Sequence, residues 1–356
     1  MTHHRIPVFD GDGHVYENEN EIVQYFENEY KGARRFDVFS LFPSVDGWAR
    51  GLMVSATADR RKYMHTDAQV WSEMLDRVGL EGSVLYPTAG LGAGLLKEKH
   101  VSVAMAAAYN NWLEDRYTSK DDRLYGAGMV PVHDQEAAVR EIRRCAEDRK
   151  NFVAMFLPSR TSLPVTYGDR FFWPMYEEAE RQGMPLAIHG GPSGGMGFDH
   201  FDDFCKIHTL SHPVSLFIQL TDIIFSGVFD AFPKLRIAFL EAGCTWVPFM
   251  MDRMDYEFDS VFGASKRRQL KKRPSEYLAE GDNFWVATEL GEKGLKYAID
   301  AMGGADRIIY ASDYPHEPTD DEIVGDVPEF IDNPEYDDKV KADILGRSAK
   351  RLYRLT

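Results

Sequence analysis

Short apolar segments rich in β-branched and aromatic residues recur along the whole chain. Longer segments with the apolar period of a helix separate them. The runs AMFLP (154–158) and RIAFLE (236–241) are apolar almost throughout instead of alternating, as strands buried on both faces are. The pattern predicts strands at Ile6–Phe9, Ser83–Tyr86, Leu124–Val130, Phe152–Leu157, Pro185–His189, Leu235–Leu240, Asn283–Thr288 and Arg307–Ala311.

Helix-period segments follow each of these strands. Gly183 is a stop signal after the fourth of them, and Pro213 is a start signal for the fifth. We therefore expect a single α/β domain over 1–356, a (β/α)8 barrel rather than a doubly wound sheet. The helices are predicted at Asp67–Val78, Val101–Tyr117, Gln135–Asp148, Asp169–Arg181, Pro213–Phe225, Thr245–Phe258, Gly291–Met302 and Asp338–Arg351.

Two segments interrupt this rhythm. An insertion at 18–65 follows the first strand, and His200–Ser211 extends the loop after the fifth. In a barrel both would lie over the catalytic face and could form a lid. Their aromatic residues indicate an apolar or aromatic pocket, or simply packing of the insertion on the barrel. These residues are Phe36, Phe39, Phe42, Trp48, Phe198, Phe201 and Phe204.

Charge and composition narrow the partners. The 356 residues include 41 Lys and Arg against 57 Asp and Glu, for a net charge of −16. Such a surface repels phosphate backbones and anionic lipids, so we expect a small-molecule substrate and neither nucleic acid nor membrane. The three cysteines form no pair motif, and Met1 leads directly into a strand-like run. We expect a cytoplasmic protein, and the long insertions could supply a homodimer interface.

The chemistry of a β/α barrel is concentrated at the carboxyl ends of its strands. The first strand runs into DGDGHVYE, which supplies Asp12, His14 and Glu17. Asp12 and His14 alternate along one strand, so their side chains point to the same face and form half of a cation site. His189 ends the fifth strand, before two glycines that leave room for a substrate.

Two later strands also end in residues of the ligand type. The sixth ends in IAFLEAG with Glu241, and the eighth ends in IIYASDYPHEP with Asp313 and His316. Each residue alone has an ordinary structural interpretation, such as a helix-capping acid or a turn residue. Together they fall at the one face where this fold does chemistry. We therefore predict a metal centre at that rim.

The sequence resembles the amidohydrolase superfamily, in the amidohydrolase 2 branch that includes aminocarboxymuconate semialdehyde and resorcylate decarboxylases. The resemblance extends over nearly the whole chain. It rests on the DGDGHVYE start, the IHGG strand end, FSGVFDAFPKLRIAFLEAG with WVPFMMDRMD, and RIIYASDYPHEP.

The resemblance implies a metal held by Asp12 and His14 on the first strand, His189 on the fifth and Asp313 on the eighth. His212 resembles a further active-site histidine that follows the fifth strand. The decarboxylases carry a catalytic histidine just past the sixth strand, where this sequence has Glu241. Glu241 and Glu17 are additional candidate ligands. The mixed oxygen and nitrogen set suits Zn, Mn or Fe.

The first functional hypothesis is metal-assisted hydrolysis or non-oxidative decarboxylation of a small carboxylate or aromatic substrate. In hydrolysis, the metal would activate water and Asp313 or Glu241 would take the proton. In decarboxylation, Asp313 would protonate the carbon that loses CO2.

Two alternatives remain open. Glu17, Glu241, His208 and His212 could hold a second metal, which would make the protein a dinuclear non-heme iron oxygenase. A start of the helix at Pro213 would place His208 and His212 on different elements. The other alternative is a binding barrel that has lost its activity.

Overall fold

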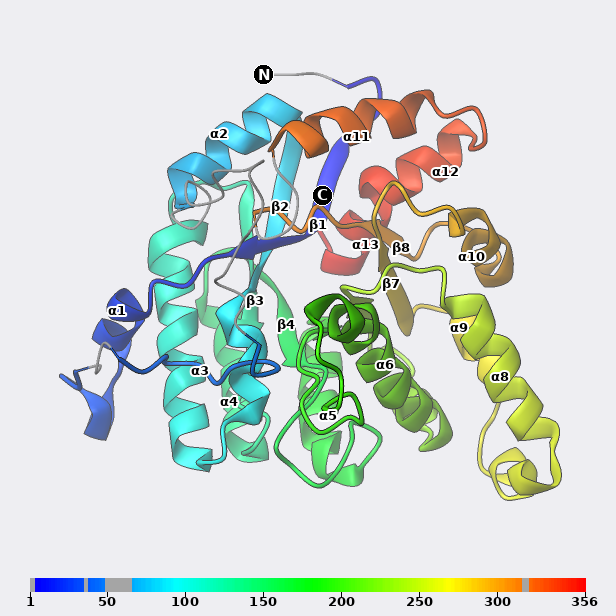
Figure 1. The fold of residues 1–356 in the computed structure, drawn as a ribbon, viewed down its shortest axis with the longest axis horizontal. Coiled ribbons are helices and arrows are strands. Elements are labelled where there is room, and N and C mark those ends of the chain that lie inside the picture. Colours follow the sequence, from blue (N-terminus) through cyan, green and yellow to red (C-terminus); the bar gives the residue numbers. More distant parts are fainter. Residues whose placement is uncertain (1–3, 35–37, 49–65, 316–319) are drawn as a thin grey trace.

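A computed structural model describes residues 4–34, 38–48, 66–315 and 320–356 of the chain. Its centre is one sheet of eight parallel strands in the order β1 to β8, and every adjacent pair is parallel. The helices succeed one another around the outside of the strands (Figure 1). The predicted (β/α)8 barrel is therefore confirmed.

All eight predicted strands are present. They are β1 Val8–Val15, β2 Leu80–Pro87, β3 Leu124–Met129, β4 Phe152–Pro158, β5 Leu186–His189, β6 Ile237–Leu240, β7 Phe284–Thr288 and β8 Ile308–Tyr310. The principal helices are α1 Glu19–Ile22, α2 Ala68–Val78, α3 Lys99–Leu113, α4 Gln135–Asp148, α5 Trp173–Gln182, α6 Phe204–Phe225 and α7 Val228–Ala231. They continue with α8 Val247–Asp259, α9 Pro274–Ala279, α10 Leu295–Met302, α11 Asp320–Asp332, α12 Asp338–Ala342 and α13 Ser348–Tyr353.

Strand β1 extends further than its apolar run predicts. It continues to Val15 with every residue buried, so Asp12 and His14 lie within the strand and not past its end. The segment after β8 completes the barrel against it, because the backbone N–H groups of Ser312 and Asp313 both donate to the carbonyl oxygen of Asp12, at 3.2 and 3.0 Å. This backbone pairing fixes the first and eighth strand ends relative to each other.

The predicted start of the fifth helix at Pro213 is wrong. Helix α6 begins at Phe204, and the carboxylate of Asp203 caps it by accepting from the N–H of Cys205 at 2.8 Å. Proline is tolerated inside this helix, in place of the expected break. Residues 204–211 are therefore helical and not loop, and His208 and His212 lie one turn apart on the same helix.

The described part of the 18–65 insertion contacts loops at the carboxyl ends of the strands. Ser193, after β5, donates its backbone N–H to the carbonyl of Val45 at 3.2 Å. A side chain at Gly92, in the loop after β2, would meet the carbonyl of Pro43. Beside α3, Glu21 accepts from the indole N–H of Trp112 at 3.0 Å. Its role as a lid remains a prediction.

Two buried arginines hold the opposite, amino-terminal end of the barrel. Arg236, directly before β6, donates to the carbonyls of Gly183, Arg351 and Leu352. Arg307, directly before β8, donates to three further carbonyls, at 2.6–2.9 Å. These contacts serve stability and leave the carboxyl end for chemistry.

Within the described ranges, no helix is long and apolar enough to span a bilayer.

Replacing Arg236 tests whether this arginine stabilises the amino-terminal end of the barrel. We expect Arg236→Met to lower the free energy of unfolding by about 3 kcal/mol, because three buried carbonyls lose a charged donor. Arg253→Met, at an exposed arginine of α8 paired with Glu257, is the control and should change stability by less than about 0.5 kcal/mol. Urea denaturation of both variants measures the difference; equal stabilities would contradict this role for Arg236.

Candidate metal centre

Four side chains that are distant in sequence converge at the carboxyl end of the barrel. Asp12 and His14 come from β1, His189 ends β5, and Glu241 follows β6. One ligand-type atom from each lies within 4.8 Å of the corresponding atoms of the others. Asp12, His14 and His189 are completely buried. The structure thus brings together four of the six predicted ligands.

The hydrogen bonds of the two histidines set the protonation of their rings. Nδ1 of His14 lies 2.9 Å from the carbonyl oxygen of Pro87, and Nδ1 of His189 lies 2.8 Å from that of Gly190. A carbonyl can only accept, so each Nδ1 carries a proton. The two Nε2 atoms face each other at 3.2 Å. Two neutral rings would point lone pairs at each other there, so this geometry requires a cation.

The separations between these donor atoms lie within about 0.2 Å of those expected in the coordination shell of a transition metal. Oδ1 of Asp12 lies 3.7 Å from Nε2 of both histidines. Oε2 of Glu241 lies 3.4 Å from Nε2 of His189 and 3.8 Å from that of His14. Neighbouring ligands at about 2.1 Å from one ion are roughly 3.0–3.6 Å apart. The residues therefore fit a divalent ion with nitrogen and oxygen ligands, the set that suits Zn, Mn or Fe.

The same carboxylates change the protonation of His189. Burial disfavours the charged ring, but the negative charges of Asp12 and Glu241 prevail and raise the pKa of His189 to about 9. In the metal-free protein, a proton on Nε2 can therefore supply the positive charge that the site requires. A metal ion has to displace this proton.

Asp313 has a different place from the one implied by the family resemblance. It is buried beside β1, 6% exposed, but it is not in the group of four whose ligand atoms lie mutually within 4.8 Å. Glu241 occupies the fourth position. Both residues have left-handed backbone, with φ of 51° at Asp313 and 68° at Glu241. Such strained conformations are concentrated at functional sites, and here both follow barrel strands.

Asp10 is a residue of the site that the sequence reasoning missed. It is fully buried two positions before Asp12, and it accepts from the hydroxyls of Ser83 and Ser312 at 2.5 and 2.8 Å. It also accepts from the backbone N–H of Ser312 and of Asp12. Burial raises its pKa to about 6. Asp10 thereby joins β1, β2 and the segment after β8 beneath the metal ligands.

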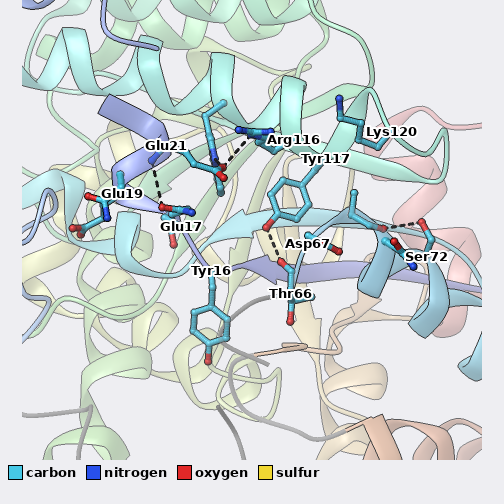
Figure 2. Close-up of a pocket in the computed structure, with 15 residues that line it drawn as sticks. Tyr16, Glu17, Glu19, Glu21, Thr66, Asp67, Ser72, Arg116, Tyr117 and Lys120 are labelled. Carbon is cyan, nitrogen blue, oxygen red and sulfur yellow. Dashed lines mark hydrogen bonds and ion pairs between the residues drawn. The ribbon is translucent and has the colours of Figure 1, made fainter. Parts of the chain in front are cut away.

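Glu17 lies apart from the four-residue cluster. Its carboxylate accepts from the backbone N–H groups of Thr88, Ala89 and Gly90, where the loop after β2 begins. Burial raises the pKa of Glu17 to about 7. The carboxylate thus holds a loop, as an acid at a helix start does. It also borders a polar cavity of about 990 Å³ between α2 and α3 (Figure 2).

His212 stands behind Glu241. Its Nδ1 lies 3.9 Å from Oε1 of Glu241, and its ring packs edge-on against His208 with centroids 4.7 Å apart. Phe204 continues this row along α6.

Across the described ranges, the cluster of four is the one group of three or more ligand-type residues close enough to share an ion. The second metal of the oxygenase hypothesis therefore gains no support; His316 lies outside the described residues.

The predicted aromatic residues divide into several groups. Phe42 is buried, Phe39 is exposed, and Phe36 lies outside the described residues. Trp48 contacts Phe204 at the start of the row on α6, with ring centroids 6.3 Å apart.

Inside the barrel, other aromatic rings surround the histidines. The rings of Tyr86 and Phe156 lie 5.8 and 6.3 Å from that of His189. The metal centre is therefore enclosed by apolar and aromatic groups, which strengthens electrostatic interactions within it.

Proton displacement predicts how metal affinity depends on pH. At pH values below the pKa of about 9, His189 must lose one proton to bind an ion, so raising the pH favours binding. We expect the apparent Kd for Mn²⁺ to fall by about tenfold per pH unit between pH 6.5 and 8.5. Chelator competition measures it, and calorimetry in buffers of different ionisation enthalpy counts the released proton. A Kd that stays the same over this pH range would contradict a protonated His189.

Comparisons with known proteins identify the family of this chain. The sequence profile described as amidohydrolase matches residues 84–355. The chain is 24% identical to a 2-amino-3-carboxymuconate-6-semialdehyde decarboxylase from Dictyostelium discoideum, over 82% of this chain and 79% of that protein. It is 24% identical to a gamma-resorcylate decarboxylase from Polaromonas sp. strain JS666, over 79% and 86%.

Solved structures share the fold. A dihydroxybenzoic acid decarboxylase from Polaromonas sp. JS666, with bound manganese and the inhibitor 2-nitroresorcinol, superposes with a TM-score of 0.74. The two chains are 19% identical, and the match covers 98% of this chain and 97% of the other. The profile match spans most of the chain and includes two of the four clustered residues, His189 and Glu241, whereas Asp12 and His14 precede it.

The family assignment therefore rests on the profile match, with the eight-stranded barrel as independent support. The sequence resemblance to the amidohydrolase 2 branch is confirmed. This chain belongs to the amidohydrolase family.

Proposed function

We propose that this protein is a metal-dependent decarboxylase that acts, without an oxidant, on a small aromatic carboxylate. The observation that carries the proposal is the buried pair of Nε2 atoms enclosed by two carboxylates, because it needs a cation. The similar proteins support the reaction class, since those named above are decarboxylases and one of them holds manganese. The aromatic rings around the centre suit an aromatic substrate.

Asp12, His14, His189 and Glu241 would hold the ion. A divalent metal bound there supplies positive charge that orients anionic oxygens of the substrate and stabilises charge that develops during the reaction. Backbone carbonyls fix both imidazoles through Nδ1, so the rings are oriented before the ion binds. Manganese, zinc and iron are all compatible with this donor set.

Asp313 would supply the proton. It lies at the rim beside Asp12, and the backbone bond to that residue fixes its position. In the reaction, the bond between the ring and the carboxylate carbon breaks, and its electron pair stays on the ring. The carboxyl group of Asp313 gives its proton to that ring carbon, and CO2 leaves. Asp313 then regains a proton from solvent, so the net change is ArCOO⁻ + H⁺ to ArH + CO2.

Glu241 would act as a ligand, with His212 behind it. The family resemblance implies a catalytic histidine at this position, and Glu241 differs from it in charge. Its Oε2 faces the two ligand histidines while Oε1 faces His212. A base at this place also suits hydrolysis, in which Glu241 would accept a proton from water. Hydrolysis is therefore the second candidate reaction.

A substrate panel separates these reactions. We expect the Mn²⁺-loaded protein to release CO2 from 2,6-dihydroxybenzoate or from 5-carboxyvanillate with no uptake of O2, because the proposed step uses only a proton. A coupled CO2 assay, product chromatography and an oxygen electrode measure the three quantities. Hydrolysis of an ester or amide analogue with no CO2 release would support the second candidate. Consumption of O2 with two bound irons would support the oxygenase, and inertness with every substrate would support a binding barrel.

Substituting Asp313 tests the proton donor. We expect Asp313→Asn to lower kcat by about 10²–10⁴-fold, the usual contribution of a positioned acid. The Kd for Mn²⁺ should change by less than about threefold, because Asp313 is outside the four-residue cluster. Asp306→Asn, at the other end of β8, is the matched control and should keep full activity. Full turnover in Asp313→Asn would remove Asp313 from the mechanism, and loss of the metal would make it a ligand.

A further inference from the structure

The turn that carries Glu241 has an unusual backbone. It leaves β6 with φ of 68° at Glu241 and 59° at Gly243, two left-handed residues within three positions. A glutamate pays a steric cost in this region, so the surrounding structure has to enforce it. From this turn, Oε2 of Glu241 lies 3.8 Å from Nε2 of His14 and 3.4 Å from Nε2 of His189.

The carboxylate of Glu292, from the segment after β7, lies inside this turn. It accepts from the backbone N–H of Cys244 at 3.0 and 3.1 Å and from that of Thr245 at 3.1 Å. A Cβ added to Gly243 would lie 2.4 Å from Oε1 of Glu292. The absence of a side chain at Gly243 thus makes room for this carboxylate.

Glu292 is itself anchored to the barrel. The hydroxyl of Thr288, the last residue of β7, donates to its Oε1 at 2.9 Å. The carbonyl of Thr288 accepts from Ala311, next to β8, at 3.1 Å. Thr288 is completely buried. The contacts therefore run without interruption from two barrel strands through Glu292 to the turn after β6.

We propose that Glu292 is a positioning residue of the metal centre, which holds the turn 241–245 so that Glu241 faces His14 and His189. The inference rests on the proposed metal site but not on the reaction. An alternative is that Glu292 only caps the start of α8, where Trp246 makes no side-chain cap. A cap would contribute to the stability of the fold and leave metal affinity unchanged.

Metal affinity distinguishes the two roles. We expect Glu292→Gln to weaken Mn²⁺ binding by about 10–100-fold, as is typical when a group that orients a ligand is lost. Asp255→Asn is the matched control. Its carboxylate accepts from the N–H and the hydroxyl of Ser275 at the start of α9, at 3.0 and 2.7 Å. We expect this control to bind Mn²⁺ as the unmodified protein does.

A double-mutant cycle tests whether Glu292 acts through Glu241. In a Glu241→Ala background the ligand is gone, so adding Glu292→Gln should change the Kd for Mn²⁺ by less than twofold. An equal loss in both backgrounds, or unchanged affinity in Glu292→Gln alone, would overturn the proposal.

A milder variant covers the case in which Glu292→Gln does not fold. Thr288→Val removes one donor to Glu292 and keeps the shape of the side chain, and we expect it to weaken Mn²⁺ binding by about threefold or more, again only when Glu241 is present. Unchanged affinity would overturn the proposal. All these titrations are made without substrate, so a failure of the decarboxylase proposal would not alter their outcome.

Discussion

The whole site depends on the approach of two imidazole nitrogens. Nε2 of His14 and Nε2 of His189 lie 3.2 Å apart in a buried region. Because both Nδ1 atoms donate to backbone carbonyls, a neutral ring has no proton on Nε2 to donate to the other ring. Only a positive charge makes this pair stable. The negative charges of Asp12 and Glu241 favour a bound cation further, so the four side chains together form a candidate cation site.

The barrel supplies rigidity to this arrangement through groups that do not touch the ion. Asp10 joins three segments beneath Asp12, and Glu292 holds the turn that carries Glu241. Buried carboxylates are costly unless hydrogen-bonded, and both of these are satisfied by hydroxyl and backbone donors. The carboxyl end of the barrel therefore concentrates acids that position other groups, and the opposite end uses Arg236 and Arg307 for stability.

The sequence was sufficient for the architecture because strands covered on both faces leave continuous apolar runs, as in β4 and β6. It also located the rim residues, since ligand-type side chains followed those runs at His189 and Glu241. It did not show which of the two acids, Glu241 or Asp313, joins Asp12, His14 and His189 in the cluster of four. The choice between Glu241 and Asp313 depends on left-handed backbone at both residues, and nothing in the local sequence specifies those angles.

Two other differences have similar causes. Pro213 indicated a helix start, but the cap at Asp203 begins α6 earlier and places His208 and His212 on one helix. Glu17 shares the first strand's motif, yet its carboxylate is directed to backbone N–H groups after β2. Diffraction from crystals grown with Mn²⁺, measured on both sides of the manganese absorption edge, tests the cation site most directly. We expect one anomalous peak about 2.1 Å from both Nε2 atoms and from the carboxylates of Asp12 and Glu241; a peak elsewhere, or no peak, would contradict the site.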